Sequence, residues 1–126
     1  MAINNFFELP ADKTIGETEH FYLIYDGFAV SPGHVLIISK VLQEDYFALS
    51  VSEKADLDNA ISLAKKLIEK EHSPDGYNIG MNCGAAAGQT VFHFHCHIIP
   101  RYHGDMDDPR GGVRHCVVGK GFYGGA

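Results

Sequence analysis

Apolar residues recur along this chain with two different spacings, and each spacing predicts a different element. Two short apolar runs, Phe21–Tyr25 and Val35–Ile38, are separated by Asp26-Gly27 and by Ser31-Pro32-Gly33. Gly and Pro commonly interrupt strand-forming runs at turns. We therefore expect two neighbouring strands that form a hairpin.

A long amphipathic helix is predicted in the middle of the chain. It opens at Ser52, and its apolar positions recur at steps of three and four residues, namely Leu57, Ala60, Ile61, Ala64, Leu67 and Ile68. Ser50 with Glu53 would form a capping box, or Ser52 would cap the helix alone. We expect this helix to end near His72, and we expect a shorter helical piece over Gln43–Leu49.

Strict alternation marks the segment Val91–Pro100. Histidine occupies every second position, at His93, His95 and His97, and apolar residues fall between and beside them at Phe92, Phe94, Cys96 and Ile98. Successive side chains of a strand point to opposite faces, so we predict three imidazoles on one face and the four apolar side chains in a core. Such a row of outward imidazoles is a candidate site.

Together these elements predict an α+β domain with one long and one short helix. The long helix would cover one face of an antiparallel sheet, and the other face would carry the histidines. The chain has 126 residues, 45% of them hydrophobic, which is enough for one domain with its own core. We expect a single domain over 1–126, with its core at about 5–101 and a Gly-rich, extended C-terminal tail over 102–126.

Composition argues against several classes of protein. The three cysteines, Cys83, Cys96 and Cys116, form no C-x-x-C pair, so we expect reduced thiols rather than a disulfide framework or a cysteine zinc site. A basic leader with an apolar stretch is not apparent, and no apolar run approaches the roughly 18 residues of a membrane span. We expect a cytoplasmic protein. The net charge of −6 argues against a nucleic-acid surface.

Two kinds of chemistry use a row of neutral imidazoles. Zinc is bound by histidine nitrogens, and two histidines at i and i+2 on a strand can share one ion. Alternatively, the central imidazole attacks phosphorus and forms a covalent phosphoramidate. The loop Gly84–Thr90 favours the second chemistry, because its small residues let backbone N–H groups approach an oxyanion and Gln89 and Thr90 add neutral donors.

At this point the chain resembles a known family. The segment from Gly88 through the three histidines to Ile99 resembles the histidine triad (HIT) motif, in which histidines alternate with apolar residues. Ser31–Ile38, Asp26 and Asn82 also fall where the family has matching residues, so the resemblance covers roughly Phe21–Arg101. It implies an α+β homodimer that binds purine nucleotides and hydrolyses or transfers nucleoside monophosphates.

The resemblance also implies roles for the histidines. His95 would be the nucleophile that forms a nucleotidyl-histidine intermediate. His97 would bind the scissile phosphate and assist the leaving group, and His93 and His34 would support the ring of His95. The related nucleotidyl transferases have glutamine at the third position of the triad, so His97 favours hydrolysis.

The remaining matched residues would bind the nucleotide. Gly88, Gln89 and Thr90 would hold the phosphate, Asn82 would contact the phosphate or the sugar, and Asp26 would accept hydrogen bonds from the ribose hydroxyls. The resemblance requires no cofactor, although Mg²⁺ would accompany a polyphosphate substrate. Two tail arginines, Arg110 and Arg114, would either reach the polyphosphate or leaving group or remain solvated. The isolated histidines are expected at the surface, and they are His20, His72, His103 and His115.

Three functions stay open at this stage. The first is a nucleotide hydrolase or phosphoramidase that acts at the α-phosphate of a purine nucleotide conjugate. The second is a zinc-dependent hydrolase that uses the same histidine row, and the third is a nucleotide-binding module with little turnover. The substrate could be a dinucleoside polyphosphate, a nucleoside phosphoramidate or an acylated adenylate, because all of these share the adenylate half.

Overall fold

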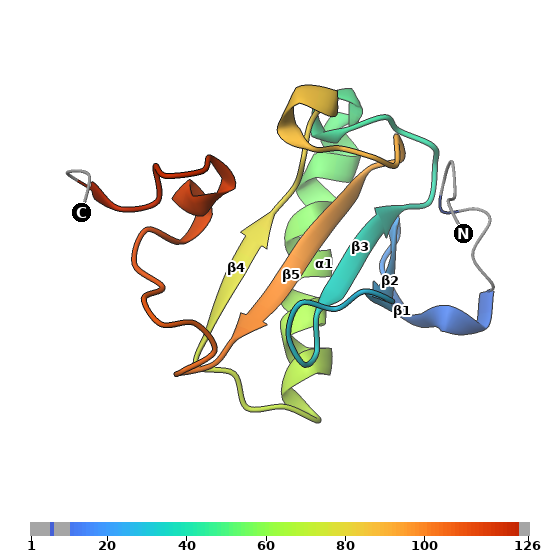
Figure 1. Cartoon of the computed structure of the whole chain (residues 1–126). Helices are drawn as coiled ribbons and strands as arrows, with labels where there is room; N and C mark the ends of the chain where they lie inside the picture. Colours follow the sequence, from blue (N-terminus) through green and yellow to red (C-terminus); the bar gives the residue numbers. More distant parts are fainter. Residues whose placement is uncertain (1–5, 7–10, 124–126) are drawn as a thin grey trace.

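The structure is a computed structural model that describes residue 6 and residues 11–123. Within these residues, five antiparallel strands form one sheet in the order β1-β2-β3-β5-β4, and one α-helix, α1 (Val51–Glu69), crosses one face of it (Figure 1). The strands are β1 (Thr14–Glu17), β2 (Phe21–Tyr25), β3 (Val35–Ser39), β4 (Gly76–Gly80) and β5 (His95–Arg101). Four 3-10 helices complete the described part, namely η2 (Ala11–Lys13), η3 (Tyr46–Ala48), η4 (Ala85–Ala87) and η5 (Gly112–Cys116). The predicted α+β class is confirmed.

The predicted hairpin is present as β2 and β3. The two strands pair antiparallel from Phe21 opposite Ser39 to Tyr25 opposite Val35. Strand β1 was not predicted from the sequence. It has only four residues, contains Gly16 and pairs with β2 through an irregular register, so it lacks the apolar alternation that identifies a strand.

Helix α1 begins with the predicted capping box. The Ser50 hydroxyl accepts the N–H of Glu53 at 3.1 Å, and the Glu53 carboxylate accepts the N–H of Ser50 at 2.7 Å. The helix ends at Glu69 with Lys70 as its C-cap, three residues before the predicted end near His72, and the N–H of His72 still bonds to the carbonyl of Ile68. The predicted helical piece over Gln43–Leu49 is the shorter η3, which Asp45 caps.

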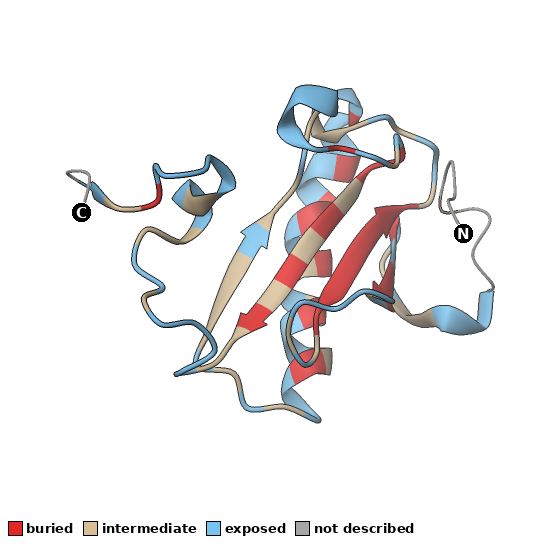
Figure 2. Cartoon of the chain, viewed as in Figure 1, coloured by how far each residue is buried: buried red, intermediate tan, exposed pale blue. Residues whose placement is uncertain are grey.

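The sheet has a core on the helix side and a smaller apolar cluster on the other side. Alternate residues of β3 serve the two faces, with Val35 and Ile37 toward α1 and Leu36 and Ile38 away from it. Strand β3 is therefore buried along its whole length, as Figure 2 shows. On α1, the buried apolar residues are Leu57, Ala60, Ala64 and Ile68, as the periodicity predicted.

Two sequence predictions near the ends of the fold need correction. Strand β5 begins only at His95, so Phe92 lies before the strand and is 42% exposed instead of buried. Phe94, Cys96 and Ile98 do lie in the core. The tail is not simply extended, because it turns beside the β4 edge and forms η5, which packs against β4 (Figure 1). The predicted domain start at 5 and the last three tail residues lie outside the described residues.

The isolated histidines are less exposed than predicted. Only His103 among them is fully exposed, whereas the other three are partly buried by local contacts. His72 lies against Gly33, and His115 bonds to the Arg110 carbonyl and packs its ring on Phe122. The three cysteines are unpaired, and burial raises the pKa of Cys96 to about 12. No helix of the described chain has the length and apolar character to cross a membrane.

Candidate active site

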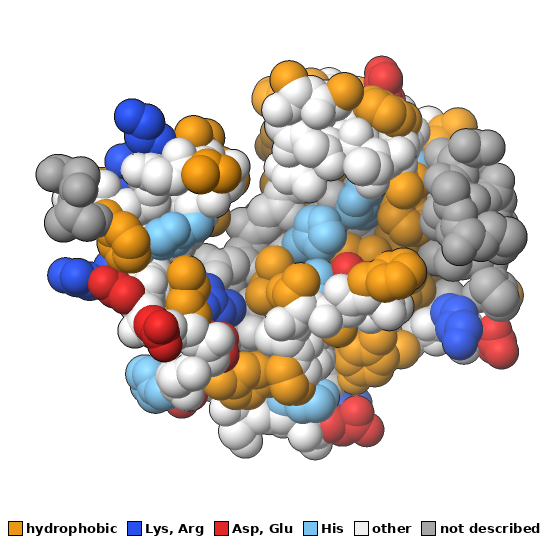
Figure 3. All heavy atoms as spheres, in the orientation of Figure 1, with side chains coloured by type: hydrophobic (Ala, Val, Ile, Leu, Met, Phe, Trp, Pro, Cys, Tyr) orange, Lys and Arg blue, Asp and Glu red, His pale blue; other side chains and the backbone are white. Residues whose placement is uncertain are grey.

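Two of the three histidines face away from α1 because β5 pairs with β3. His95 lies opposite Ile38 and His97 lies opposite Leu36, and both partners belong to the apolar cluster on this side of the sheet. Directly paired residues point to the same face. Figure 3 shows histidine side chains in a hollow on this side. The alternation therefore predicts the orientation of His95 and His97 correctly.

His95 has a defined tautomer. Its Nδ1 lies 2.9 Å from the carbonyl oxygen of His93, and a carbonyl can only accept, so Nδ1 carries the proton. In the neutral ring the lone pair is then on Nε2. The edge of the Phe6 ring packs against His95, with ring centroids 5.0 Å apart. The His93 carbonyl, two residues earlier in the chain, thus leaves the Nε2 lone pair of neutral His95 available.

His93 does not belong to the outward row. It lies before β5 and is fully buried, with Nε2 2.7 Å from the Ser39 carbonyl and Nδ1 accepting the N–H of Phe6 at 3.1 Å. Burial lowers the pKa of His93, and the nearby His95 lowers it further. His93 contacts His95 through its backbone carbonyl, and both rings pack against Phe6 on the side of the sheet away from α1. His93 therefore shares the predicted face, but it is buried rather than outward.

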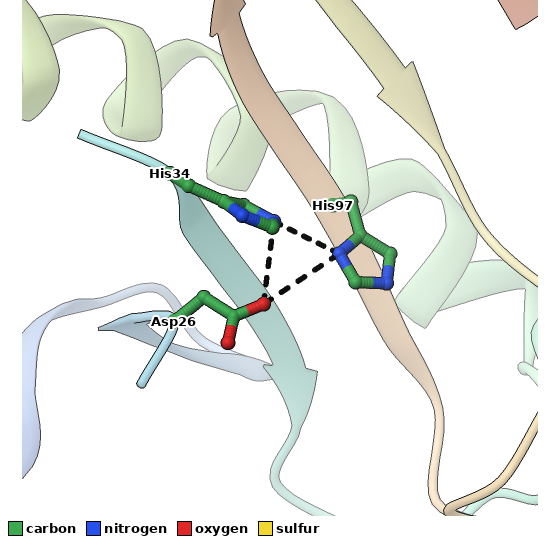
Figure 4. Close-up of side chains that lie close together, drawn as sticks. All are labelled: Asp26, His34 and His97. Carbon is green, nitrogen blue, oxygen red and sulfur yellow. Dashed lines mark hydrogen bonds and ion pairs between the residues drawn. The ribbon is translucent and has the colours of Figure 1, made fainter. Parts of the chain in front are cut away.

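His34 pairs with His97 rather than with His95. The turn before β3 places His34 Nε2 2.9 Å from His97 Nδ1 (Figure 4). His34 Nδ1 accepts the N–H of Val30 at 3.2 Å, so the proton of neutral His34 is on Nε2 and is donated to His97. Neutral His97 therefore carries its own proton on Nε2. The predicted support of the His95 ring by His34 is not found.

Asp26 completes this group at the end of β2. Its Oδ2 lies 3.4 Å from His34 Nε2 and 4.0 Å from His97 Nδ1, while its Oδ1 accepts the N–H of Phe28 at 2.8 Å. Burial lowers the pKa of His97 to about 4, with His95 and His34 adding to the effect and Asp26 opposing it. Burial also lowers the pKa of His34, against the influence of Asp26. Both rings are held neutral at pH 7.

The same three residues bring potential metal ligands together. One ligand atom from each of Asp26, His34 and His97 lies within 4.8 Å of the others. However, the Val30 N–H occupies the Nδ1 lone pair of His34, so Nε2 keeps its proton and has no lone pair for an ion. With these bonds the group is a hydrogen-bonded network and not a prepared metal site.

A cavity of about 800 Å³ opens beside His95 and His97. Its apolar wall includes Ile24 and Leu36 from the sheet, and Phe6 and Phe28 from outside it. Ligand pockets of roughly 300–1,000 Å³ typically combine apolar walls with a few polar groups. We did not predict these wall residues as site residues. The alternation in β2 and β3 could have indicated Ile24 and Leu36, since both point away from α1.

The loop Gly84–Thr90 is not the predicted phosphate cradle. The N–H groups of Gly88 and Gln89 donate to the carbonyls of Ala85 and Gly84, within the loop itself. The Gln89 side chain is 4% exposed, and it donates to the carbonyls of Glu44 and Val91 and accepts the N–H of Gly84. The side chain that was expected to bind phosphate instead holds the loop together.

Of the other residues predicted to contact the substrate, only Thr90 lines the cavity. Thr90 is exposed and lines the cavity, whereas Asn82 is exposed and is not among the lining residues. In the tail, Arg110 forms an ion pair with Asp108 and the Arg114 guanidinium lies over the Tyr123 ring, and neither arginine lines the cavity. The candidate site therefore consists of His95, His97, Asp26, Thr90 and the apolar wall, with His34 bonded to His97.

Comparison with known proteins identifies the family of this chain. A family model described as the HIT domain matches residues 8–104. The chain belongs to the HIT family. It is 41% identical over 91 residues to an uncharacterised HIT-like protein of Mycoplasma genitalium, covering 70% of this chain and 62% of that protein. The chain spans less than two thirds of the length of the first curated relatives that it matches.

Other HIT proteins show the range of the family. The asymmetrical bis(5'-nucleosyl)-tetraphosphatase of Schizosaccharomyces pombe is 40% identical over 79 residues, which cover 63% of this chain and 43% of that enzyme. A crystal structure of a HIT-like protein from Bartonella henselae superposes with a TM-score of 0.72 at 29% identity, covering 80% of this chain and 81% of that one. The HIT family thus includes nucleotide hydrolases, and the fold of this chain matches solved HIT structures.

Proposed function

We propose that this HIT protein hydrolyses purine nucleotide conjugates at the α-phosphate through a covalent nucleotidyl-histidine on His95. The observation that carries the proposal is the tautomer of His95, whose Nδ1 proton is held by the His93 carbonyl so that the Nε2 lone pair is available beside the cavity. A neutral imidazole with a fixed lone pair is the form that attacks phosphorus.

The first step forms one bond and breaks one. His95 Nε2 attacks the α-phosphorus, the bond from phosphorus to the leaving nitrogen or oxygen breaks, and the electron pair departs with the leaving group. We assign the proton transfer to the leaving atom to His97 in its imidazolium form, which donates from Nε2 and keeps a proton on Nδ1. Water then attacks the nucleotidyl-histidine, which releases the nucleoside monophosphate and restores His95.

The cavity supports a nucleoside as the bound half. Ile24, Leu36 and Phe6 offer an apolar surface of the kind that a purine ring packs against, and Thr90 lines the same cavity as the two histidines. The S. pombe relative is named as a hydrolase of a dinucleoside tetraphosphate. We propose either a dinucleoside polyphosphate or a nucleoside phosphoramidate as substrate, with the leaving group outside the apolar wall.

Several features are proposed on the family resemblance alone. They are a homodimer, a purine base and a cytoplasmic location. We also propose that the chemical step needs no metal and that Mg²⁺ would enter only with a polyphosphate. The zinc-dependent alternative is disfavoured because both ring nitrogens of His93 are already bonded, to the Ser39 carbonyl and the Phe6 N–H, and because the Val30 N–H on His34 Nδ1 keeps the proton of His34 on Nε2. The binding-module alternative is disfavoured because a binding site has no use for a prepared nucleophile.

Intact-mass measurement tests the proposal. Metal-stripped protein would be mixed for milliseconds to seconds with diadenosine tetraphosphate or with an adenosine phosphoramidate, and quenched without acid. We expect a transient adduct of one adenylate on the wild type and none on His95→Ala. His103→Ala is the matched control, since it removes a fully exposed histidine and should keep the adduct. Nucleotide binding without adduct or turnover would favour the binding module, and turnover only with added zinc would favour the metal enzyme.

A further inference from the structure

We propose that Asp26 is a positioning residue whose carboxylate lets His97 carry the proton that it delivers to the leaving group. The inference rests on the hydrolase function proposed above. It differs from the ribose contact that the family resemblance implies for Asp26. The observation behind it is the triangle formed by Asp26, His34 and His97 (Figure 4).

When His97 takes up a second proton on Nδ1, that N–H needs a hydrogen-bond acceptor, because His34 is itself a donor there. Neutral His97 receives the His34 Nε2–H at its Nδ1, at 2.9 Å. If Nδ1 is protonated, two N–H groups face each other at that distance, and the bond is lost. His34 cannot give up its proton to relieve this, because its Nδ1 already accepts the Val30 N–H. Asp26 Oδ2 lies 3.4 Å from His34 Nε2 and 4.0 Å from His97 Nδ1, within ion-pair distance of both rings, and a small shift brings it to hydrogen-bond distance of a protonated His97 Nδ1.

The Asp26 carboxylate is the neighbouring group that favours a protonated His97. Three titratable groups face the ring, namely His95 on the same strand, His34 before β3 and Asp26 after β2. Burial, His95 and His34 all lower the pKa of His97, and Asp26 alone raises it. A charged imidazolium at this position therefore depends on Asp26 for its only favourable charge interaction among the described residues.

The carboxylate is also fixed in place. Oδ1 accepts the Phe28 N–H at 2.8 Å, and the Asp26 N–H donates to the His34 carbonyl at 2.9 Å. The side chain is 14% exposed. These bonds leave Oδ2 directed at the two imidazoles.

The proton balance follows from this arrangement. Protonated His97 has Nδ1–H toward Asp26 and Nε2–H toward the substrate. As the bond from phosphorus to the leaving atom breaks, that atom takes the Nε2 proton together with the bonding electron pair. Neutral His97 then holds its proton on Nδ1, bonded to Asp26, and has a lone pair on Nε2. That lone pair takes a proton from the attacking water in the second step, which restores the imidazolium.

Two substrates with different leaving groups test the proposal. Asp26→Asn keeps an oxygen for the Phe28 N–H but replaces the accepting Oδ2 with an amide donor. For an adenosine 5'-phosphoramidate of an alkylamine, whose nitrogen must be protonated to leave, we expect kcat/KM to fall by about 100-fold. For adenosine 5'-(4-nitrophenyl phosphate), whose phenolate leaves without a proton, we expect a change of less than about threefold.

The pH profile gives a second readout. Removing the carboxylate lowers the pKa of His97, so the high-pH limb of kcat/KM for the phosphoramidate should move to lower pH in Asp26→Asn. The ¹⁵N resonances of His97 should titrate at lower pH in the same variant, which is a measurement independent of turnover. Asp58→Asn makes the same chemical change on the exposed face of α1 and should alter neither measurement.

Distinct outcomes would overturn the inference. An equal loss with both leaving groups, together with an unchanged His97 titration, would assign Asp26 to binding or folding. If the loss disappears with 2',3'-dideoxy forms of both substrates, Asp26 binds the ribose hydroxyls. Failure of the proposed function itself looks different, because the wild type would then turn over neither substrate.

Discussion

Two loops flank the histidine face, and they use their polar groups in opposite ways. The turn from Asp26 to His34 directs a carboxylate and an imidazole at His97, so its side chains become part of the site. In the loop from Gly84 to Thr90, the Gln89 amide bonds to Gly84, to Val91 and to the carbonyl of Glu44, and the N–H groups of Gly88 and Gln89 bond within the loop. The sequence predicted ligand contacts from both loops, because the second loop has the composition of a phosphate cradle. Composition shows which groups are available, and hydrogen bonding shows which of them are left for a ligand.

The largest stability effect is expected in the second loop. Gln89→Ala removes a buried side chain and leaves the carbonyls of Glu44 and Val91 and the N–H of Gly84 without this partner. We expect the free energy of unfolding to fall by about 2–4 kcal/mol. Urea unfolding measures it, with exposed Thr90→Ala as the control that should change by less than about 0.5 kcal/mol.

Activity measurements on Gln89→Ala distinguish the structural role of Gln89 in the loop from the phosphate contact that the sequence implied. If Gln89 only holds the loop, kcat per folded molecule should stay within a few-fold of the wild type. An unchanged stability with a strongly raised KM would instead show that Gln89 binds the substrate phosphate, and the contrast between the two loops would then be lost.

The sequence predicts the fold better than it predicts the contacts. The hairpin, the helix with its Ser50–Glu53 capping box and the outward face of His95 and His97 all follow from local periodicity. His93 is buried rather than outward, and it lies before β5, which begins four residues later than the predicted start at Val91. The partner of Gln89 is the Glu44 carbonyl, 45 positions away in the chain. No local pattern reports such a contact, and the same holds for the His34–His97 pair.

A second, smaller effect is the loss of folding stability at acid pH that we expect from His97, which lies beside Asp26 and His34. The pKa of folded His97 is about 4, below the value of about 6.5 for an unfolded histidine. Between these values the unfolded chain binds more protons than the folded one, so stability is present above about pH 6.5 and is lost as the pH falls toward 4. Allowing for partial solvent exposure, we expect His97 to contribute a loss on the order of 1–2 kcal/mol between pH 7.5 and pH 5.

The variant His97→Gln isolates this contribution, because its amide oxygen still accepts from His34 but does not titrate in this range. Urea unfolding at the two pH values should show a smaller loss in the variant than in the wild type. An identical loss in both proteins would mean that His97 stays neutral in both states or titrates equally in both.

The smallest effect compares one glycine from each loop. Gly88 has a φ of +91°, which an L side chain adopts with strain, and a Cβ there would meet no heavy atom within 4 Å. Gly27 lies in the first loop with equally open space and without a positive φ. We expect Gly88→Ala to cost about 1–2 kcal/mol, since the αL region disfavours a Cβ by that amount.

Gly27→Ala should instead be neutral or stabilising by up to about 1 kcal/mol, because alanine restricts the unfolded chain. Both substitutions add the same methyl group in the same open surroundings, so their difference in urea unfolding reports the backbone alone. Equal effects would mean that the second loop relaxes out of the left-handed conformation at little cost. In that case the hydrogen bonds from the N–H groups of Gly88 and Gln89 to the carbonyls of Ala85 and Gly84 would not fix the conformation of this loop.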